Sequence, residues 1–302
     1  MQDAIAAMRD AFARLAAGGF EQPPRQSVGE GGVLTMLSSV AGARGDAAAK
    51  VVSVRAANPA RGLPTIHAAV VWVDGETGRL LAVLDGNTVT ALRTGATTGL
   101  ATDLLAPARA KVLAMLGAGA QAPDQVAAVC AVRPIEEVRI WSRTPASAAA
   151  LAALVETMPG VAVRTLPSPA AAVATADVVC CATPATAPLF EASALGTRVH
   201  VNAIGAYRPD MCELSPELLR DASVVVVDTR EAALSEAGDL IQAIERGYLA
   251  ADRLTELGEL ASATRTCGEG WTVFKSVGIA VQDLALAGAV IGKAAGAAAP
   301  EA

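Results

Sequence analysis

A short glycine turn between a strand-like run and a helix-like run constrains this chain more than any other feature. Val112–Leu116 is apolar throughout and predicts a buried strand, and residues 121–132 have the composition of a helix. Between them, residues 117–122 read Gly-Ala-Gly-Ala-Gln-Ala, which matches the Gly-x-Gly-x-x-Gly/Ala fingerprint. Such glycines let the backbone approach a pyrophosphate, which the free N–H groups of the helix N-terminus then bind. The turn predicts a dinucleotide site that includes Gly117, Gly119, Ala120 and Gln121.

Strand-like and helix-like runs alternate along the chain after residue 111. This rhythm favours a doubly wound parallel sheet with helices on both faces. We therefore predict a Rossmann-type NAD(P)-binding domain over residues 108–273. Its strand candidates are residues 112–116, 137–141, 161–166, 178–181, 199–204 and 224–228.

The first third of the chain has a different rhythm. Apolar residues at helical spacing predict an amphipathic helix over residues 2–17, and residues 87–105 predict a second helix. Between them, strand-like runs joined by short turns predict an antiparallel or mixed sheet. A long apolar helix over residues 277–298 completes this unit. The predicted fold is therefore α/β: the Rossmann domain plus an α+β domain with a mixed sheet, made of residues 1–107 and 274–302.

Composition and charge exclude several classes of protein. The formal net charge of −6 without a basic stripe argues against a nucleic-acid binder. The most apolar window, residues 280–299, contains Gln282, Asp283 and Lys293, which argues against a membrane span. Two histidines and no His/Cys cluster argue against a metal site. The chain has five cysteines without regular spacing, and its first residues lack the features of a signal peptide. Both observations favour a cytoplasmic protein with reduced thiols.

The end of the second Rossmann strand indicates which cofactor is bound. NAD enzymes usually carry an acid there, whereas this chain has Ser142 followed by Arg143 and Thr144. No carboxylate would repel a 2′-phosphate, and Arg143 could pair with it. The alternative is a solvated arginine before a helix cap. We expect NADPH, with NADH as the alternative, and we expect Thr183, just after a later strand, to contact it.

Five segments in order along the chain resemble the ornithine cyclodeaminase/mu-crystallin family, and the resemblance covers nearly all of its length. The family implies a homodimer whose first domain supplies both the dimer interface and the substrate-binding sheet. It also implies a small imino or amino acid substrate, with the nicotinamide at the floor of a cleft between the domains. The matching segments are residues 50–53, 85–96, 116–122, 202–210 and 274–285.

The resemblance assigns roles to particular residues. Arg25, Lys50 and Arg93 match positions that hold a substrate carboxylate, and a guanidinium suits that task because it can bind two oxygens at once. Asp210 matches a catalytic acid, which would stabilise an iminium or move its proton, and Lys50 is the second catalytic candidate. The remaining assignments are Met36 and Gly278 to the substrate pocket and Thr94 to the cofactor.

Each of these residues also has a structural interpretation. Arg25 follows two prolines and could lie in a surface loop, and Lys50 could be a solvated residue at a strand edge. Arg93 stands among small helical residues, where its anionic partner could be a structural aspartate. Asp210 could cap a helix over residues 213–220.

The two histidines and the adjacent cysteines fall in apolar strand-like runs. We expect His200 to be packed and hydrogen-bonded, and His67 could contact a ligand from the first sheet. Cys180 and Cys181 are expected to be strand core, because adjacent cysteines rarely form a relaxed disulfide.

Two departures from the family's ornithine cyclodeaminases suggest a function. Those enzymes carry an acid where this chain has Met36, and a ribose-binding aspartate where it has Ser142. Both differences favour an NADPH-dependent reductase of a cyclic ketimine acid, Δ1-pyrroline-2-carboxylate or Δ1-piperideine-2-carboxylate. An ornithine cyclodeaminase or an alanine-dehydrogenase type of enzyme is the second class, and a non-catalytic NADPH-binding protein is the third.

Overall fold

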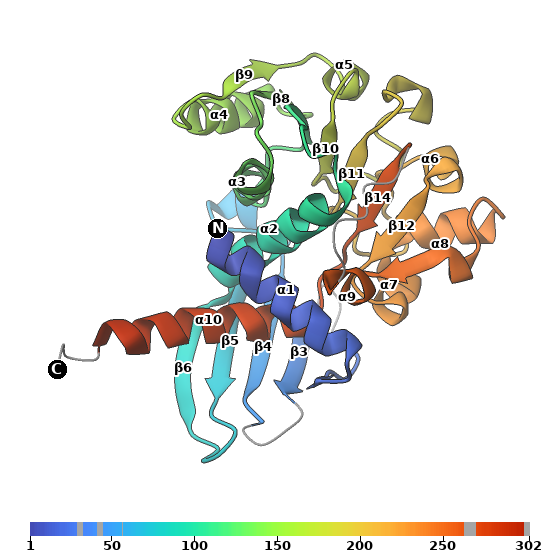
Figure 1. Ribbon diagram of the computed structural model, residues 1–302. Coiled ribbons are helices and arrows are strands. Elements are labelled where there is room, and N and C mark those ends of the chain that lie inside the picture. The colour runs from blue at the N-terminus through green and yellow to red at the C-terminus, as the bar shows by residue number, and fades with distance from the viewer. Residues whose placement is uncertain (29–32, 41–44, 56, 263–269, 299–302) are drawn as a thin grey trace.

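A parallel sheet of eight strands forms the larger part of the molecule. The computed structural model describes residues 1–28, 33–40, 45–55, 57–262 and 270–298 (Figure 1). Every strand pair in this sheet is parallel, which confirms the predicted doubly wound architecture. In sheet order the strands are β13 (Leu254–Glu256), β12 (Val224–Val227), β14 (Thr272–Lys275), β11 (His200–Ala203), β10 (Val178–Cys181), β7 (Val112–Leu116), β8 (Glu137–Trp141) and β9 (Ala162–Thr165).

Helices cover the parallel sheet because its strands are apolar on both sides. All four residues of β10, β11 and β14 are buried, as strands in the middle of a two-faced sheet must be. The helices that connect the eight strands of this sheet are α3 (Ala122–Val132), α4 (Pro145–Val155), α5 (Pro169–Val173), α6 (Pro216–Asp221), α7 (Arg230–Glu236), α8 (Gly238–Glu245) and α9 (Leu257–Ala261). Short 3₁₀ helices lie at Asn58–Arg61, Ala192–Ala194 and Ala251–Arg253.

A second sheet is built from the first third of the chain. All pairs of its described strands are antiparallel, so the sheet is antiparallel and not the expected mixed one. The reason is that short connections between neighbouring strands require antiparallel pairing. Its path is β1 (Phe20–Glu21), β3 (Val33–Val40), β4 (Ala47–Val54), β5 (Ile66–Val73) and β6 (Leu80–Asp85), with β2 (Gln26–Val28) beside β3.

Three helices join the two sheets. In Figure 1, α10 (Ala280–Ala298) crosses the antiparallel strands, and α1 (Gln2–Ala16) and α2 (Gly86–Leu105) lie between the sheets. The small residues of α2 allow close approach: a Cβ added to Gly95 would lie 2.6 Å from the carbonyl oxygen of Asp124 in α3. One apolar cluster accordingly includes Val70 from the antiparallel sheet and Phe274 from the parallel sheet.

The end of the chain enters the parallel sheet before it leaves for the first domain. The predicted boundary between residues 273 and 274 falls inside β14, which pairs with both β11 and β12. The crossing therefore follows Lys275, because the backbone of Phe274 and Lys275 belongs to the sheet. Among the described residues, no helix is both long and apolar enough to cross a membrane.

Candidate active site

The carboxyl ends of the parallel strands face the antiparallel sheet, and the turns after them line two adjoining cavities. The outer cavity, of about 310 Å³, lies over the glycine turn and the end of β8. The inner cavity, of about 290 Å³, lies between the two sheets. Residues 182–184, which follow β10, line both of them. The two cavities therefore form one groove, at the edge where open α/β sheets bind their ligands.

The glycine turn presents bare backbone to this groove. Gly117 has a φ of 98°, and an added Cβ would lie 2.5 Å from the carbonyl oxygen of Ala182. Gly119 has no atom within 4 Å of such a Cβ, so the space beside it is open. Gln121 lines the inner cavity, whereas Ala120 lies in the turn and lines neither cavity. This open turn before α3 fits a bound pyrophosphate.

The end of β8 lines the outer cavity with the predicted cofactor residues. Ser142, Arg143 and Thr144 all contribute to its wall, and no carboxylate does among the described residues. The Ser142 hydroxyl accepts a hydrogen bond from the Thr144 N–H at 3.3 Å. Arg143 is exposed, and the described part of the chain offers its guanidinium no ion-pair partner. A cation without a partner at this place is suited to an anionic group on the cofactor ribose.

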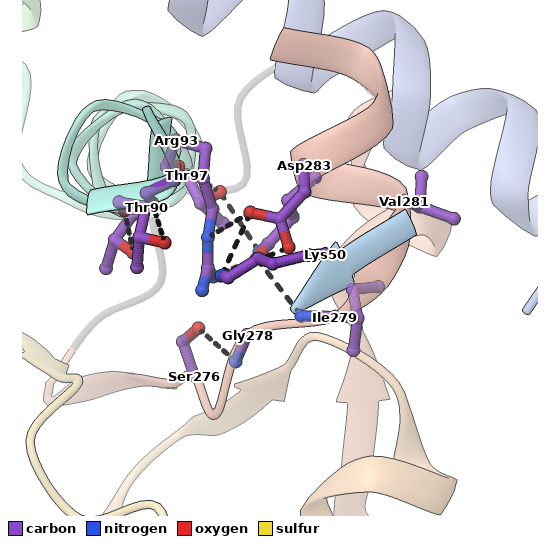
Figure 2. Close-up of polar contacts among 12 residues, drawn as sticks. Lys50, Thr90, Arg93, Thr97, Ser276, Gly278, Ile279, Val281 and Asp283 are labelled. Atoms are coloured by element: carbon purple, nitrogen blue, oxygen red, sulfur yellow. Dashed lines mark hydrogen bonds and ion pairs between the residues drawn. The ribbon is translucent and has the colours of Figure 1, made fainter. Parts of the chain in front are cut away.

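Two buried cations share one carboxylate at the inner cavity. Lys50 from β4 and Arg93 from α2 meet Asp283 from α10, as Figure 2 shows. Lys50 Nζ lies 3.2 Å from Asp283 Oδ1, and Arg93 Nε lies 3.4 Å from the same oxygen. Their side chains are only 4%, 7% and 2% exposed, in that order. With Lys50 protonated the group carries a net positive charge, because one carboxylate offsets two cations.

The positive charges face the cavity. Lys50 and Arg93 line it while Asp283 lies behind them, and no carboxylate is among the described residues of the wall. Arg93 Nη1 is bonded to Gln282, but Nη2 has no hydrogen-bond partner within the described ranges. Buried charges are stable only when paired, so this arrangement is prepared for a further anion.

Lys50 is the titratable group of the cluster. Burial is the largest cause that lowers its pKa, from 10.5 to about 8; the neighbouring Arg93 acts in the same direction, while Asp283 opposes the change. A lysine with such a pKa exchanges its proton near neutral pH, which suits a general acid.

Arg25 also lines the inner cavity. Its Nε lies 2.9 Å from Oε1 of Glu236 in α7, and its Nη2 donates to the carbonyl oxygen of Gly278 at 2.5 Å. The residue thus connects the segment before β2 with the Rossmann domain. It is not the solvated loop arginine of the structural interpretation.

Asp210 lies outside the groove, contrary to the expectation of a catalytic acid. Its side chain is 63% exposed and forms an ion pair with Arg208 at 2.9 Å. The hydrogen bond from Arg208 lowers the pKa of Asp210, so it is an ordinary surface carboxylate. It does not cap α6 either, because Ser215 does so. Tyr207, from the same loop, lines the inner cavity instead.

Four further residues were predicted to contact the cofactor or the substrate. Thr183 lines both cavities, and Thr94 lines the inner cavity. Gly278 has a φ of 76° and lies against the Arg93 guanidinium, where an added Cβ would be 2.2 Å from Nη1. Met36 pairs with Lys50 through the backbone of β3 and β4, but its side chain lies outside the described ones.

The histidines and cysteines have structural positions. His200 is fully buried between Thr272 and Asn202, and burial lowers its pKa to about 3, as expected for a packed neutral histidine. His67 is exposed on β5 and lines neither cavity. Cys180 and Cys181 are buried free thiols in β10, as predicted.

Three buried carboxylates at the site, Asp283, Glu213 and Asp228, were not identified from the sequence. Asp283 belongs to a family segment but had no role assigned to it. Glu213 accepts hydrogen bonds from the backbone N–H groups of Thr183, Gly205 and Ala206, and thereby fixes two turns of the groove. Asp228 holds the turn after β14. The sequence does not mark these carboxylates as buried, because Lys50, Thr183 and the turn after β14, which supply partners to them, lie 30 or more residues away in the chain.

Comparisons with known proteins show the family of this chain. A family model described as "Ornithine cyclodeaminase/mu-crystallin family" matches residues 1–297. A Δ1-pyrroline-2-carboxylate reductase of Bacillus cereus is 40% identical over 242 residues, which are 79% of this chain and 74% of the relative.

Solved structures match over nearly the whole fold. The Thermococcus litoralis Δ1-pyrroline-2-carboxylate reductase in complex with NADH and L-proline has a TM-score of 0.92 at 32% identity, over 97% of this chain and 93% of that one. An archaeal alanine dehydrogenase dimer with bound NAD has a TM-score of 0.91 at 31% identity, over 100% and 93%.

Proposed function

Because the chain belongs to the ornithine cyclodeaminase/mu-crystallin family, we propose that it is an NAD(P)H-dependent imine reductase. Its substrate is a cyclic ketimine acid, Δ1-pyrroline-2-carboxylate or Δ1-piperideine-2-carboxylate, and its product is L-proline or L-pipecolate. The observation that carries the proposal is the pair of buried cations, Lys50 and Arg93, at the inner end of a dinucleotide groove. Relatives that act on the five-membered ring support it.

The inner cavity suits both ends of such a substrate. Arg93 presents Nη2 to the substrate carboxylate, and Lys50 adds a second positive charge on the same side. A charge-assisted pair of this kind fixes the plane of the imino acid. Val52, Val54 and Ile204 supply apolar wall for the ring.

We propose that Lys50 is the proton donor. Reduction of a C=N bond adds a hydride to carbon and a proton to nitrogen, and the bound cofactor supplies the hydride. The Lys50 ammonium gives its proton to the nitrogen and is then reprotonated from water. Its pKa of about 8 matches that transfer near neutral pH. Asp210 has no part in this step, because it lies outside the groove.

We assign NADPH as the preferred cofactor. The support is the outer cavity, whose described wall has the unpaired Arg143 and no carboxylate to accept from a ribose 2′-hydroxyl or repel a phosphate. Gly117 and Gly119 would hold the pyrophosphate, and Thr183 stands where the two cavities meet. One related structure contains NADH, so NADH is the alternative that must be measured.

We further propose a homodimer that forms through the outer face of the antiparallel sheet. Helix α10 covers the inner face, while the outer face carries the neighbouring row of Ala49, Val71 and Val83. Val83 is 70% exposed and Val51 is 45% exposed. An apolar sheet face of this kind is typical of an interface, and a related alanine dehydrogenase is a dimer.

Substrate turnover tests the proposed activity against the alternatives in its family. Purified protein is offered Δ1-pyrroline-2-carboxylate with NADPH, L-ornithine with NAD, and L-alanine with NAD. We expect rapid NADPH oxidation with the cyclic imine and no release of ammonia from L-ornithine. Ammonia and proline from ornithine would identify a cyclodeaminase instead, and pyruvate from alanine would identify a dehydrogenase. Cofactor binding without turnover of any of the three would identify a binding protein.

A further inference from the structure

A buried carboxylate behind the inner cavity holds two segments of the site at once. Asp228, directly after β12, is 1% exposed. Its Oδ2 accepts from the Ser276 hydroxyl at 2.8 Å and from the N–H groups of Val277 and Gly278 at 2.8 and 2.9 Å. Its Oδ1 accepts from Nε2 of Gln282 at 3.2 Å. Three of these partners, the two backbone N–H groups and the Gln282 amide, can only donate, which is the environment of an ionised carboxylate even though burial raises the pKa of Asp228.

Gln282 connects this carboxylate to Arg93. Its Oε1 accepts from Arg93 Nη1 and from the Ile279 N–H, and its Nε2 donates to Asp228 and to the Thr97 hydroxyl. The Ile279 N–H can only donate and an ionised Asp228 can only accept. The amide of Gln282 can therefore take only one orientation, with its oxygen toward the guanidinium.

The same carboxylate also holds the other side of the guanidinium. Gly278, whose N–H donates to Asp228, lies close to the Arg93 guanidinium, since a Cβ added to it would be 2.2 Å from Nη1. Arg93 is thus held between a turn and an amide, and both depend on Asp228. No contact links Asp228 to Arg93 directly among the hydrogen bonds of the described residues.

We propose that Asp228 is a positioning residue for substrate recognition: through Gln282 and the Gly278 turn it orients the Arg93 guanidinium toward the substrate carboxylate. This inference rests on the proposed function, in which Arg93 binds that carboxylate. Asp228 itself does not line the cavity and touches no reacting atom.

The near-isosteric variant Asp228→Asn tests the inference. If the NH₂ group of the introduced amide faced Gln282, two donors would oppose each other, so Gln282 would turn over and present Nε2 to Arg93. If that NH₂ group faced the turn, it would oppose three donors. In either case the KM for Δ1-pyrroline-2-carboxylate rises roughly tenfold or more, because a hydrogen bond to a charged group is lost. We expect kcat to change much less, and the Kd for NADPH to stay within about twofold.

A charge exchange separates this role from a merely structural one. In the double variant Asp228→Asn with Gln282→Glu, the amide introduced at position 228 can donate to the carboxylate introduced at position 282, while the amide oxygen accepts from the turn. The other oxygen of that carboxylate can then accept from Arg93 and Ile279. The double variant has the net charge of the wild type, and we expect it to recover most of the loss in KM. Gln282→Glu alone serves as the control. It places two carboxylates together, so its KM should not be close to that of the wild type.

The outcomes distinguish this inference from the proposed function. If the wild type reduces the cyclic imine and Asp228→Asn leaves KM unchanged, or the double variant recovers nothing, the positioning role is overturned and the function stands. If the wild type oxidises L-alanine instead, the proposed function fails, and the same KM comparison with L-alanine decides the role of Asp228. Absence of turnover with either substrate overturns both.

Discussion

The Nζ atom of Lys50 lies 3.2 Å from Oδ1 of Asp283, although 233 positions separate the two residues in the chain. A strand of the first sheet and the C-terminal helix are thereby joined at the inner end of the groove, with Arg93 on the same oxygen. The charges of Lys50, Arg93 and Asp283 determine the pH dependence and the stability that we expect of the enzyme.

The first prediction concerns the pH dependence of turnover. Burial lowers the Lys50 pKa from 10.5 to about 8, so the ammonium form is present below that pH and lost above it. We expect kcat/KM for the cyclic imine to fall as pH rises above about 8. Lys50→Ala should lower it by on the order of 100-fold or more.

Two further variants control for this prediction. Lys50→Arg keeps the charge but does not titrate in this range, so it should lose the decline above about pH 8 even if its rate is lower. Asp210→Asn should leave both the rate and the pH profile unchanged, because Asp210 is exposed and outside the groove. A wild-type profile shared by Lys50→Arg, or a large loss in Asp210→Asn, would contradict the assignment of Lys50 as the acid.

The second prediction concerns stability. Asp283→Asn leaves two buried cations side by side, and breaking such a pair costs about 3–5 kcal/mol. The free energy of unfolding, measured in urea, should fall by that order. The pKa of Lys50 should also fall further, which moves the decline in kcat/KM to lower pH. Asp221→Asn, from an exposed pair with Arg220, is the matched control and should leave unfolding unchanged.

The third prediction compares two glycines of the groove. Gly278→Ala forces a Cβ to within 2.2 Å of Arg93 Nη1 at a φ of 76°, so the guanidinium must move. The KM for the imino acid should rise roughly 10- to 100-fold with NADPH affinity preserved. Gly119→Ala places its Cβ in open space, so stability should not change while NADPH affinity falls. Equal effects of both variants on both ligands would contradict these separate roles.

The fourth prediction concerns cofactor preference. Arg143 has no ion-pair partner among the described residues, and Arg143→Ala removes this cation from the outer cavity. The KM for NADPH should therefore rise on the order of 10- to 100-fold, and the KM for NADH should not change. Ser142→Asp should disfavour NADPH further, because its carboxylate would repel the 2′-phosphate. An unaltered ratio of the two KM values in Arg143→Ala would show that the ribose is recognised elsewhere.

The fifth prediction concerns assembly. Val83→Glu places a charge on the apolar outer face of the antiparallel sheet, and the protein should change from dimer to monomer in light scattering. Leu154→Glu, at a residue 51% exposed on α4, is the control and should stay dimeric. A monomeric wild type, or a dimer that Val83→Glu leaves intact, would contradict this interface.

The helices and strands could be predicted well, because they depend on local patterns in the sequence. Contacts between residues distant in the chain could be predicted less well. The glycine turn and the parallel sheet could be predicted because a strand, a turn and a helix follow one another within a few residues. The predicted domain boundary falls inside β14, because Phe274 and Lys275 precede a helix in sequence whereas their backbone pairs with β11 and β12.

The site shows the same division. Lys50 and Arg93 were recognisable from segments typical of the family, but their shared partner Asp283 comes from the far end of the chain. Asp210 lies outside the groove although its motif predicts a catalytic acid, because a motif fixes the place of a residue in a loop and not the direction of its side chain. Asp228 could not be found, because its donors come from a segment about fifty residues away.

The most direct test of the central claim is the stoichiometry of one reaction, with NADPH consumption and L-proline formation followed together on Δ1-pyrroline-2-carboxylate. We expect one L-proline to form for each NADPH oxidised, with both rates strongly lowered in Lys50→Ala and retained in Asp210→Asn. No oxidation of NADPH or NADH with cyclic imino acids, by protein that binds the cofactor, would contradict it.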